Sequence, residues 1–284
     1  MEEKEPIRRV RRTGGDRVAH TDRTFLATTQ DLFDQLFVYH PAPWIDRDWA
    51  LLTGLPLEEV SFQAADRTEL FGWFVASSKP APVLLWCHGN AGNIINRLEN
   101  LVELHTLGLA VFLFDYRGYG RSHGRPSEDG LYQDALAAYA YLRETRGIDP
   151  RQIVLFGRSL GAAVAGDVAS RRSAAGLILE SAFPSIAALT KSYMWGFPAY
   201  WLLAARYNLS ERLSNVHIPV LVIHGDRDHI VPIEMGEQVY AAAHSPKAFY
   251  RVEGADHNTL YITGGKPYFR RLKQFVEEVT GMRI

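Results

Sequence analysis

The chain has 284 residues, of which 47% are hydrophobic and 22% are charged, a composition typical of a globular protein with a sizeable core. Its formal net charge of −1 gives no field that would attract nucleic acid, so we expect no nucleic-acid partner. The single cysteine, Cys87, excludes an internal disulfide and favours a reducing, cytoplasmic location. We expect no secretory leader and no membrane-spanning segment, because no stretch has 18 consecutive apolar residues.

Residues 1–23 mix charges of both signs with few apolar side chains, which predicts a flexible tail. A small basic cluster lies within it, formed by Arg8, Arg9, Arg11 and Arg12. We interpret the cluster as solvated, with weak contact to anionic lipid as the alternative. Apolar residues then recur at helical spacing between Phe25 and Phe37, ahead of Pro41. This amphipathic helix is expected to pack on the edge of the domain, and peripheral docking at a membrane surface is the alternative.

Short apolar runs then alternate with helical patterns along most of the chain. Strands are expected at Val60–Ala64, Leu70–Ala76, Val83–Trp86, Ala110–Phe114, Ile153–Phe156, Gly176–Leu179, Val220–Ile223 and Ala248–Val252. Helices are expected at Ile94–Leu107, Leu131–Leu142, Leu160–Gly166, Ile233–Ala243 and Tyr268–Val279. This alternation, with strands that are apolar almost throughout, predicts an α/β fold whose parallel sheet is covered by helices on both faces. We expect residues 24–284 to form a single domain.

The alternation is interrupted between Glu180 and Val216, where no strand is predicted. The stretch Met194–Leu203 is rich in aromatic residues instead. We interpret residues 183–215, approximately, as a small helical cap inserted at the carboxyl edge of the sheet, over the place where an apolar substrate would lie. The alternative is a pair of helices that pack their aromatic side chains inward.

The segment Gly157-Arg158-Ser159-Leu160-Gly161 lies between an apolar strand and a helix of small residues. A strand that turns sharply into a helix holds its corner residue in a strained conformation, and this exposes the corner hydroxyl. The flanking glycines are expected because a Cβ there would collide with neighbouring backbone. We predict that Ser159 is a nucleophile on this elbow, and the alternative is an ordinary glycine-serine turn.

A serine hydroxyl needs a base, and the chain offers ten histidines. His257 lies in a loop between the last strand and the last helix, at the carboxyl edge where α/β proteins gather their ligands. We predict that it is the base, with a solvent-exposed loop histidine as the alternative. His88 and His224 each end a strand and are expected to serve packing or loop geometry. His229 is the remaining rival.

The acid is expected in the loop after the Val220 strand, between the serine and the histidine in chain order. Asp228 is preferred because it lies further from the strand end than Asp226 and can reach the histidine loop. Asp226 is expected to fix the loop through backbone hydrogen bonds. Glu180, at the end of the preceding strand, is the second rival.

An oxyanion that develops during acyl transfer needs backbone N–H donors. One is expected from Leu160, the residue after the serine. The second is expected from Asn90, in the glycine- and asparagine-rich loop His88–Asn93 after an early strand. Phosphate binding is the competing interpretation of this loop, but the loop lacks the glycine spacing of the common phosphate-binding motifs.

Five motifs along the chain carry a family resemblance, namely His88–Asn93, Phe114–Ser122, Gly157–Gly161, His224–Pro232 and Gly254–Asn258. Together they resemble the α/β-hydrolase fold serine hydrolases, and most closely the bud-emergence-protein-like, ABHD-type branch. The segment Phe37–Pro41 is similar to the tyrosine-proline segment that precedes the core in that branch. The resemblance covers the chain from about residue 35 to its end.

The resemblance implies an α/β-hydrolase fold with a mainly parallel, eight-stranded sheet and no cofactor. It also implies that Ser159, Asp228 and His257 form the catalytic triad, while Asn90 and Leu160 form the oxyanion hole. We therefore expect a serine hydrolase that cleaves carboxylic esters of an apolar, small-molecule acyl substrate through an acyl-enzyme, with thioester and amide bonds as further targets. The alternatives are an acyl-protein thioesterase, a peptidase, and a catalytically silent binding module. No metal site is predicted.

Overall fold

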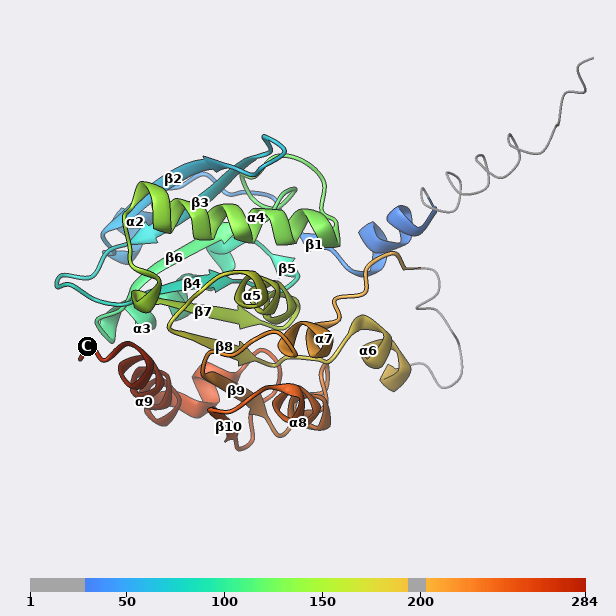
Figure 1. Cartoon of the computed structure of the whole chain (residues 1–284). Coiled ribbons are helices and arrows are strands. Elements are labelled where there is room, and N and C mark those ends of the chain that lie inside the picture. The colour runs from blue at the N-terminus through green and yellow to red at the C-terminus, as the bar shows by residue number, and fades with distance from the viewer. Residues whose placement is uncertain (1–28, 194–202) are drawn as a thin grey trace, which may run out of the picture.

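The computed structural model describes residues 29–193 and 203–284, and its centre is an eight-stranded sheet (Figure 1). The strand order is β10-β9-β8-β7-β4-β6-β3-β2. The strands are β2 (Leu57–Gln63), β3 (Glu69–Val75), β4 (Val83–Cys87), β6 (Ala110–Asp115), β7 (Ile153–Arg158), β8 (Gly176–Glu180), β9 (Val220–Gly225) and β10 (Lys247–Val252). Neighbours from β10 to β6 are parallel, whereas β3 is antiparallel to both β6 and β2. The prediction of a mostly parallel, eight-stranded sheet is confirmed.

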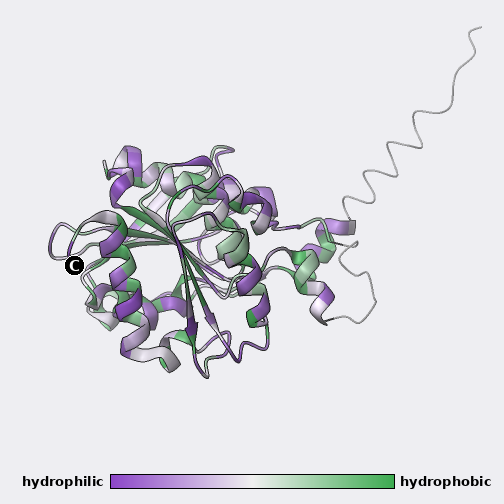
Figure 2. Ribbon diagram, turned by 60° about the horizontal axis from the view of Figure 1, so that its bottom comes forward, coloured by the Kyte–Doolittle hydropathy of each residue, from purple (hydrophilic) through white to green (hydrophobic). Residues whose placement is uncertain are grey.

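Helices cover both faces of this sheet, as predicted (Figure 2). Helices α4 (Glu128–Ala140), α5 (Leu160–Arg171) and α8 (Ile233–Ala242) pack on one face, and α3 (Leu98–Thr106) and α9 (Leu260–Thr280) on the other. Strand β4 shows why both layers are needed. Its side chains are buried alternately in the two cores, with Leu85 and Cys87 on one face and Leu84 and Trp86 on the other.

Several element boundaries differ from the sequence predictions because local capping decides them. The predicted helix after Asn93 begins as a 3-10 turn, Ile94–Arg97, capped by the Asn93 side chain, before α3 starts. Helix α4 begins earlier than predicted because the Ser127 hydroxyl accepts a hydrogen bond from the amide of Gly130 (3.1 Å). Short elements that were not predicted include the 3-10 turn Pro150–Gln152, α2 (Trp49–Thr53), β1 (His40–Pro41) and β5 (Ala91–Gly92). The last two pair with each other and bring residues near position 40 alongside the Asn90 loop.

The turn between β7 and α5 has the strained geometry predicted for it. Ser159 adopts φ 53° and ψ −120°, outside the conformations that residues with a side chain favour. A Cβ on Gly157 would lie 2.4 Å from the carbonyl oxygen of Gly161, and a Cβ on Gly161 would lie 2.1 Å from the carbonyl oxygen of Cys87. Both glycines are therefore required for the close approach of helix α5 to strands β7 and β4.

We expect Gly161→Ala to lower the free energy of unfolding by about 1–3 kcal/mol or more, because its methyl group would collide with fixed backbone. Gly166→Ala, on the same helix, is the matched control. A Cβ there would meet only the end of the Leu209 side chain, at 2.4 Å, and that side chain can move. Urea unfolding of both variants checks this, and equal losses would contradict the role assigned to Gly161.

The segment that follows β8 forms no strand among its described residues and contains α6 (Ile186–Tyr193) and α7 (Leu209–Leu213). Hydrogen bonds join this segment to the helix of residues 29–37. The Asp34 carboxylate accepts hydrogen bonds from the amides of Ala204 and Ala205, both at 3.0 Å, and burial raises the pKa of Asp34 to about 6. The boundaries of a cap at 183–215 and its position over the site stay predictions, because most of the aromatic stretch lies outside the described residues, as does the predicted tail 1–23.

The helix of residues 29–37 contacts the domain with one side only. Phe33 packs against the core, whereas Leu32, Leu36 and Phe37 are 54%, 59% and 64% exposed. Packing on the domain edge therefore holds for part of this helix. Within residues 29–193 and 203–284, no helix has the length and apolar character needed to cross a bilayer.

Candidate active site

Three loops at the carboxyl edge of the sheet bring together the residues proposed from the sequence. Ser159 follows β7, Asp228 lies in the loop after β9, and His257 lies in the loop between β10 and α9. Strands β7, β8, β9 and β10 are consecutive and parallel, so their carboxyl ends meet at one edge. The elbow is tied to this edge because the amide of Ser159 donates to the carbonyl oxygen of Glu180 (2.8 Å).

The three side chains form a continuous hydrogen-bonded series. Nε2 of His257 lies 3.1 Å from Oγ of Ser159, and its Nδ1 lies 2.8 Å from Oδ2 of Asp228. Both distances allow hydrogen bonds, and both ring nitrogens of the imidazole are used. With the proton on Nδ1, Nε2 can accept the serine proton, which is the arrangement a general base requires.

The Asp228 carboxylate is fixed by its own loop. Oδ1 accepts hydrogen bonds from the amides of Ile230 (2.9 Å) and Val231 (2.7 Å), which leaves Oδ2 to His257. Burial alone would raise the pKa of Asp228, but the hydrogen bond and charge of His257, together with the Val231 amide and the nearby His224, hold this pKa below its ordinary value. Asp228 is therefore an anion at neutral pH and fixes the tautomer of His257.

The two rival acids have other partners. Oδ1 of Asp226 accepts from the amide of Gly254 (2.7 Å), so Asp226 links two loops in the way predicted for it. Glu180 is buried, accepts a hydrogen bond from the Tyr268 hydroxyl and lies 3.3 Å from Nε of Arg158. Neither carboxylate has a recorded hydrogen bond to His257 among the described residues.

The rival base His229 and the two strand-end histidines, His88 and His224, have no recorded hydrogen bond to Ser159 among the described residues. His88 is completely buried, and burial together with the charge of Arg97 lowers its pKa to about 3. Its Nδ1 bonds the carbonyl oxygen of Gly89 (2.7 Å). Burial also lowers the pKa of His224, whose Nε2 lies 2.8 Å from the carbonyl oxygen of Val231. His229 is exposed, and its amide donates to Asp256.

The Asn90 loop and the first turn of α5 face the same space. The carbonyl oxygen of Asn90 accepts from the Tyr119 hydroxyl (2.8 Å), and its side chain donates to the carbonyl oxygen of Val38 (2.9 Å). The loop is thereby held in place. No acceptor for the backbone N–H of Asn90 or of Leu160 is recorded within the described part of the chain. Both residues line the cavity at Ser159, and the use of their amides as oxyanion donors stays a prediction.

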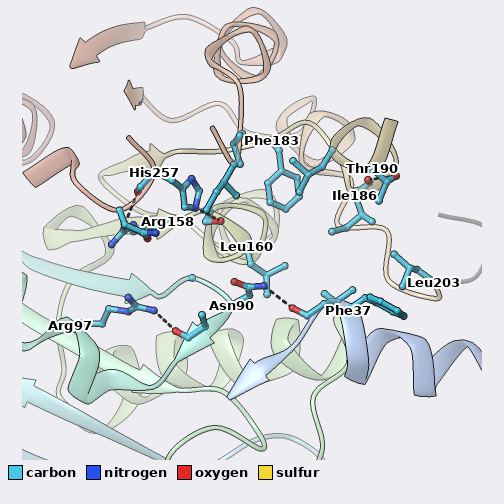
Figure 3. Close-up of a pocket in the computed structure, with 18 residues that line it drawn as sticks. Phe37, Asn90, Arg97, Arg158, Leu160, Phe183, Ile186, Thr190, Leu203 and His257 are labelled. Carbon is cyan, nitrogen blue, oxygen red and sulfur yellow. Dashed lines mark hydrogen bonds between the residues drawn. The ribbon is translucent and has the colours of Figure 1, made fainter. Parts of the chain in front are cut away.

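A cavity of ≈ 380 Å³ opens at Ser159 and His257, and its lining differs from one side to the other (Figure 3). In the close-up, Arg97 and Arg158 lie on one side of the cavity, together with His257. The other side is mostly apolar and is lined by Phe37, Phe183, Ile186 and Leu203. The helix of residues 29–37 and the segment that follows β8 thus form one apolar wall of the cavity.

Comparisons with known proteins identify the family. Residues 78–204 match a family model described as serine aminopeptidase, S33. An uncharacterized protein of Mycobacterium tuberculosis is 42% identical over 222 residues, which are 78% of this chain and 79% of that one. The alpha/beta hydrolase domain-containing protein WAV2 of Arabidopsis thaliana is 32% identical over 272 residues, 87% of this chain and 88% of the relative. The chain belongs to the α/β-hydrolase family.

The fold of this α/β hydrolase also matches solved structures. A Pyrococcus furiosus esterase superposes with a TM-score of 0.72 over 86% of this chain and 99% of its own, at 18% identity. At that identity the likeness shows the fold alone. The resemblance and the fold class inferred from the sequence are both confirmed.

Two residues of the hydrolase cavity, Arg97 and Arg158, were given no role by the sequence. Arg158 lies inside the elbow motif, but the motif itself assigns functions only to the serine and the glycines. Arg97 lies in the first turn of the helix predicted from Ile94 and occupies the N-cap position of α3 without a side-chain capping hydrogen bond, and a cation there opposes the helix dipole. That unfavourable placement is the signal that could have singled it out.

Proposed function

We propose that this hydrolase cleaves carboxylic esters through an acyl-enzyme formed on Ser159. The observation that carries the proposal is the series Ser159–His257–Asp228, hydrogen-bonded at 3.1 and 2.8 Å, at the mouth of a partly apolar cavity. A silent binding module would have no need for a strained serine aligned with an imidazole and a carboxylate.

In the proposed reaction, Oγ of Ser159 attacks the ester carbonyl carbon while Nε2 of His257 takes the hydroxyl proton. The negative oxygen of the tetrahedral intermediate accepts hydrogen bonds from the amides of Asn90 and Leu160. His257 then gives its proton to the departing alcohol, and the acyl group stays on Ser159. Water, activated by the same imidazole, hydrolyses the acyl-enzyme. Asp228 stabilises the imidazolium throughout.

The description of the matched family model raises an aminopeptidase as the second candidate. An aminopeptidase has to bind the α-ammonium group of its substrate, for which a carboxylate is the usual partner. The described residues that line the cavity include Arg97 and Arg158 and no aspartate or glutamate. This charge favours an ester over an aminoacyl amide. Thioesters fit the same geometry and belong to the proposed range of substrates.

A fluorophosphonate probe tests the nucleophile directly. We expect it to label the wild-type protein at one position, Ser159, because the activated oxygen displaces fluoride from phosphorus and stays covalently bound. Peptide mapping by mass spectrometry locates the adduct. Denatured protein is the control, since the reaction depends on the folded site. Labelling of another residue, or equal labelling after denaturation, would refute the proposed role of Ser159.

The same preparation distinguishes the substrate classes. 4-Nitrophenyl esters of increasing acyl length are expected to be turned over, whereas aminoacyl 4-nitroanilides are not. Faster turnover of the anilides would favour the peptidase.

A cytoplasmic location stays a prediction from the sequence, supported by the burial of the single cysteine, Cys87, as a free thiol.

A further inference from the structure

The cavity beside Ser159 contains two guanidinium groups whose charges are balanced very differently. Arg158 is 6% exposed, and its Nη2 donates to the carbonyl oxygen of His257 (2.7 Å) and to Oδ1 of Asn258 (3.2 Å). Its Nε lies 3.3 Å from the Glu180 carboxylate. Arg158 is thus a paired cation that also fixes the loop of the catalytic histidine.

Arg97 has no comparable partner. Its Nη2 donates to the carbonyl oxygen of Ala91, and its Nε is buried without a hydrogen-bond acceptor. Within the described part of the chain, no carboxylate lies within 4.0 Å of its guanidinium. A buried donor without an acceptor costs free energy, and a like charge nearby adds to that cost.

Arg97 nevertheless stays a cation. Burial, followed by the charge of Arg158, lowers the pKa of Arg97 to about 10, which leaves it protonated at neutral pH. The carboxyl group that acts on it from a greater distance is Asp115, whose own pKa is raised by burial to about 7. Asp115 therefore carries only part of a negative charge at neutral pH. The arginine side of the cavity is left with positive charge facing the space where a substrate would lie.

We propose that Arg97, backed by Arg158, binds an oxyanion of the substrate, a carboxylate or a phosphate, on the side of the ester opposite its apolar group. This inference rests on the proposed function and names the substrate class for it. The apolar wall formed by Phe37, Phe183 and Ile186 receives one end of the molecule, and the arginines receive the other. The preferred substrates are amphipathic, anionic esters with the reacting carbonyl between the two ends.

Two pairs of esters that differ only in an anionic group test this specificity. One pair is 4-nitrophenyl butyrate and 3-carboxy-4-nitrophenyl butyrate, and the other is 1-butyrylglycerol and its 3-phosphate. For each pair the ratio of kcat/KM, anionic over neutral, is measured in the wild type, Arg97→Gln and Arg97→Lys. Because each ratio is compared between enzymes, the intrinsic reactivity of the esters cancels.

We expect Arg97→Gln to lower at least one of the two ratios about tenfold or more, and Arg97→Lys to retain part of it. The pair that responds tells whether carboxylate or phosphate is the preferred group. Arg172→Gln, an exposed arginine at the far end of α5 from Ser159, removes the same charge outside the cavity and should leave both ratios unchanged. If Arg97 only held the Ala91 loop in place, both esters of a pair would slow alike. Unchanged ratios in Arg97→Gln would therefore overturn the proposal.

A binding measurement separates this proposal from the catalytic one. In the Ser159→Ala background, the dissociation constants of both pairs of esters are measured by calorimetry with Arg97 present and with Arg97→Gln. A preference for the anionic member of either pair that disappears in Arg97→Gln supports the anion site even if the wild type turns over no ester. If the anionic and the neutral ester of each pair bind with equal affinity whether Arg97 is present or replaced, the site is rejected even if Ser159 proves to be the nucleophile.

Discussion

Replacing Ser159 with alanine should lower kcat for ester hydrolysis by a factor of about 10⁴ or more while the protein remains folded. The loss is large because the substitution removes the oxygen that attacks the carbonyl. The oxyanion donors can then assist only the slower, direct attack of water on the ester. The fold should be retained because alanine keeps the same Cβ at the strained corner, φ 53°. Turnover of 4-nitrophenyl butyrate gives the rate, and circular dichroism with thermal unfolding gives the fold.

Ser181 is the matched control for this substitution. It follows β8, the neighbouring parallel strand, and it too has a positive φ of 48°. Its side chain is completely buried, and no partner for its hydroxyl is recorded among the described residues. Ser181→Ala should therefore keep nearly all of the activity. Equal rates for the wild type and Ser159→Ala would leave no nucleophilic role for Ser159.

The sheet and the elbow could be predicted from the sequence because local residues specify them. Strands buried on both faces have to be apolar throughout, and Gly157 and Gly161 mark the place where helix α5 approaches strand backbone. Chain order then placed the acid between Ser159 and the histidine, which favoured the loop after β9 and left Glu180, at the end of β8, as a rival. The hydrogen bonds of Asp226 to Gly254 and of Asp228 to His257 follow from the different reach of two neighbouring residues from one strand end.

Contacts between distant segments could not be predicted in this way. The Asp34 carboxylate binds the amides of Ala204 and Ala205, and the Tyr39 hydroxyl lies 2.9 Å from that of Tyr207. These contacts join the helix of residues 29–37 and the residues directly after it to the segment after α6, and no periodic pattern in the sequence marks either partner. They matter for function because the same two segments supply Phe37 and Leu203 to the apolar wall of the cavity.

Whether each arginine of the cavity has a carboxylate partner could not be predicted from the sequence either, for a similar reason. From the sequence alone, an arginine cannot be distinguished from an ordinary surface cation. Only the packed site reveals that Arg158 has Glu180 within 3.3 Å while no carboxylate among the described residues pairs with Arg97. Charge balance depends on which groups the fold brings together, so the proposed specificity could be inferred only from the structure. The proposed nucleophile, in contrast, could be inferred from the sequence.

Asp228→Asn is expected to lower kcat by about 10⁴ while leaving the loop geometry intact. Oδ1 of Asp228 accepts hydrogen bonds from the amides of Ile230 and Val231, so the carbonyl oxygen of the new asparagine has to occupy that position. Its NH₂ group then faces Nδ1 of His257 in place of Oδ2. An amide nitrogen can only donate, so Nδ1 becomes the acceptor and the ring proton moves to Nε2. With that nitrogen protonated, His257 can no longer take the proton of Ser159.

Asp226→Asn is the matched control, because it makes the same change two residues earlier in the same loop. The asparagine oxygen can still accept from the amide of Gly254, and no part of this side chain bonds His257 among the described contacts. We expect its kcat to stay within a few-fold of the wild type. The steady-state kinetics of both variants with one chromogenic ester decide between the two aspartates. A larger loss in Asp226→Asn than in Asp228→Asn would reverse the assignment, because the tautomer argument requires the carboxylate that touches Nδ1 to be the one whose loss stops catalysis.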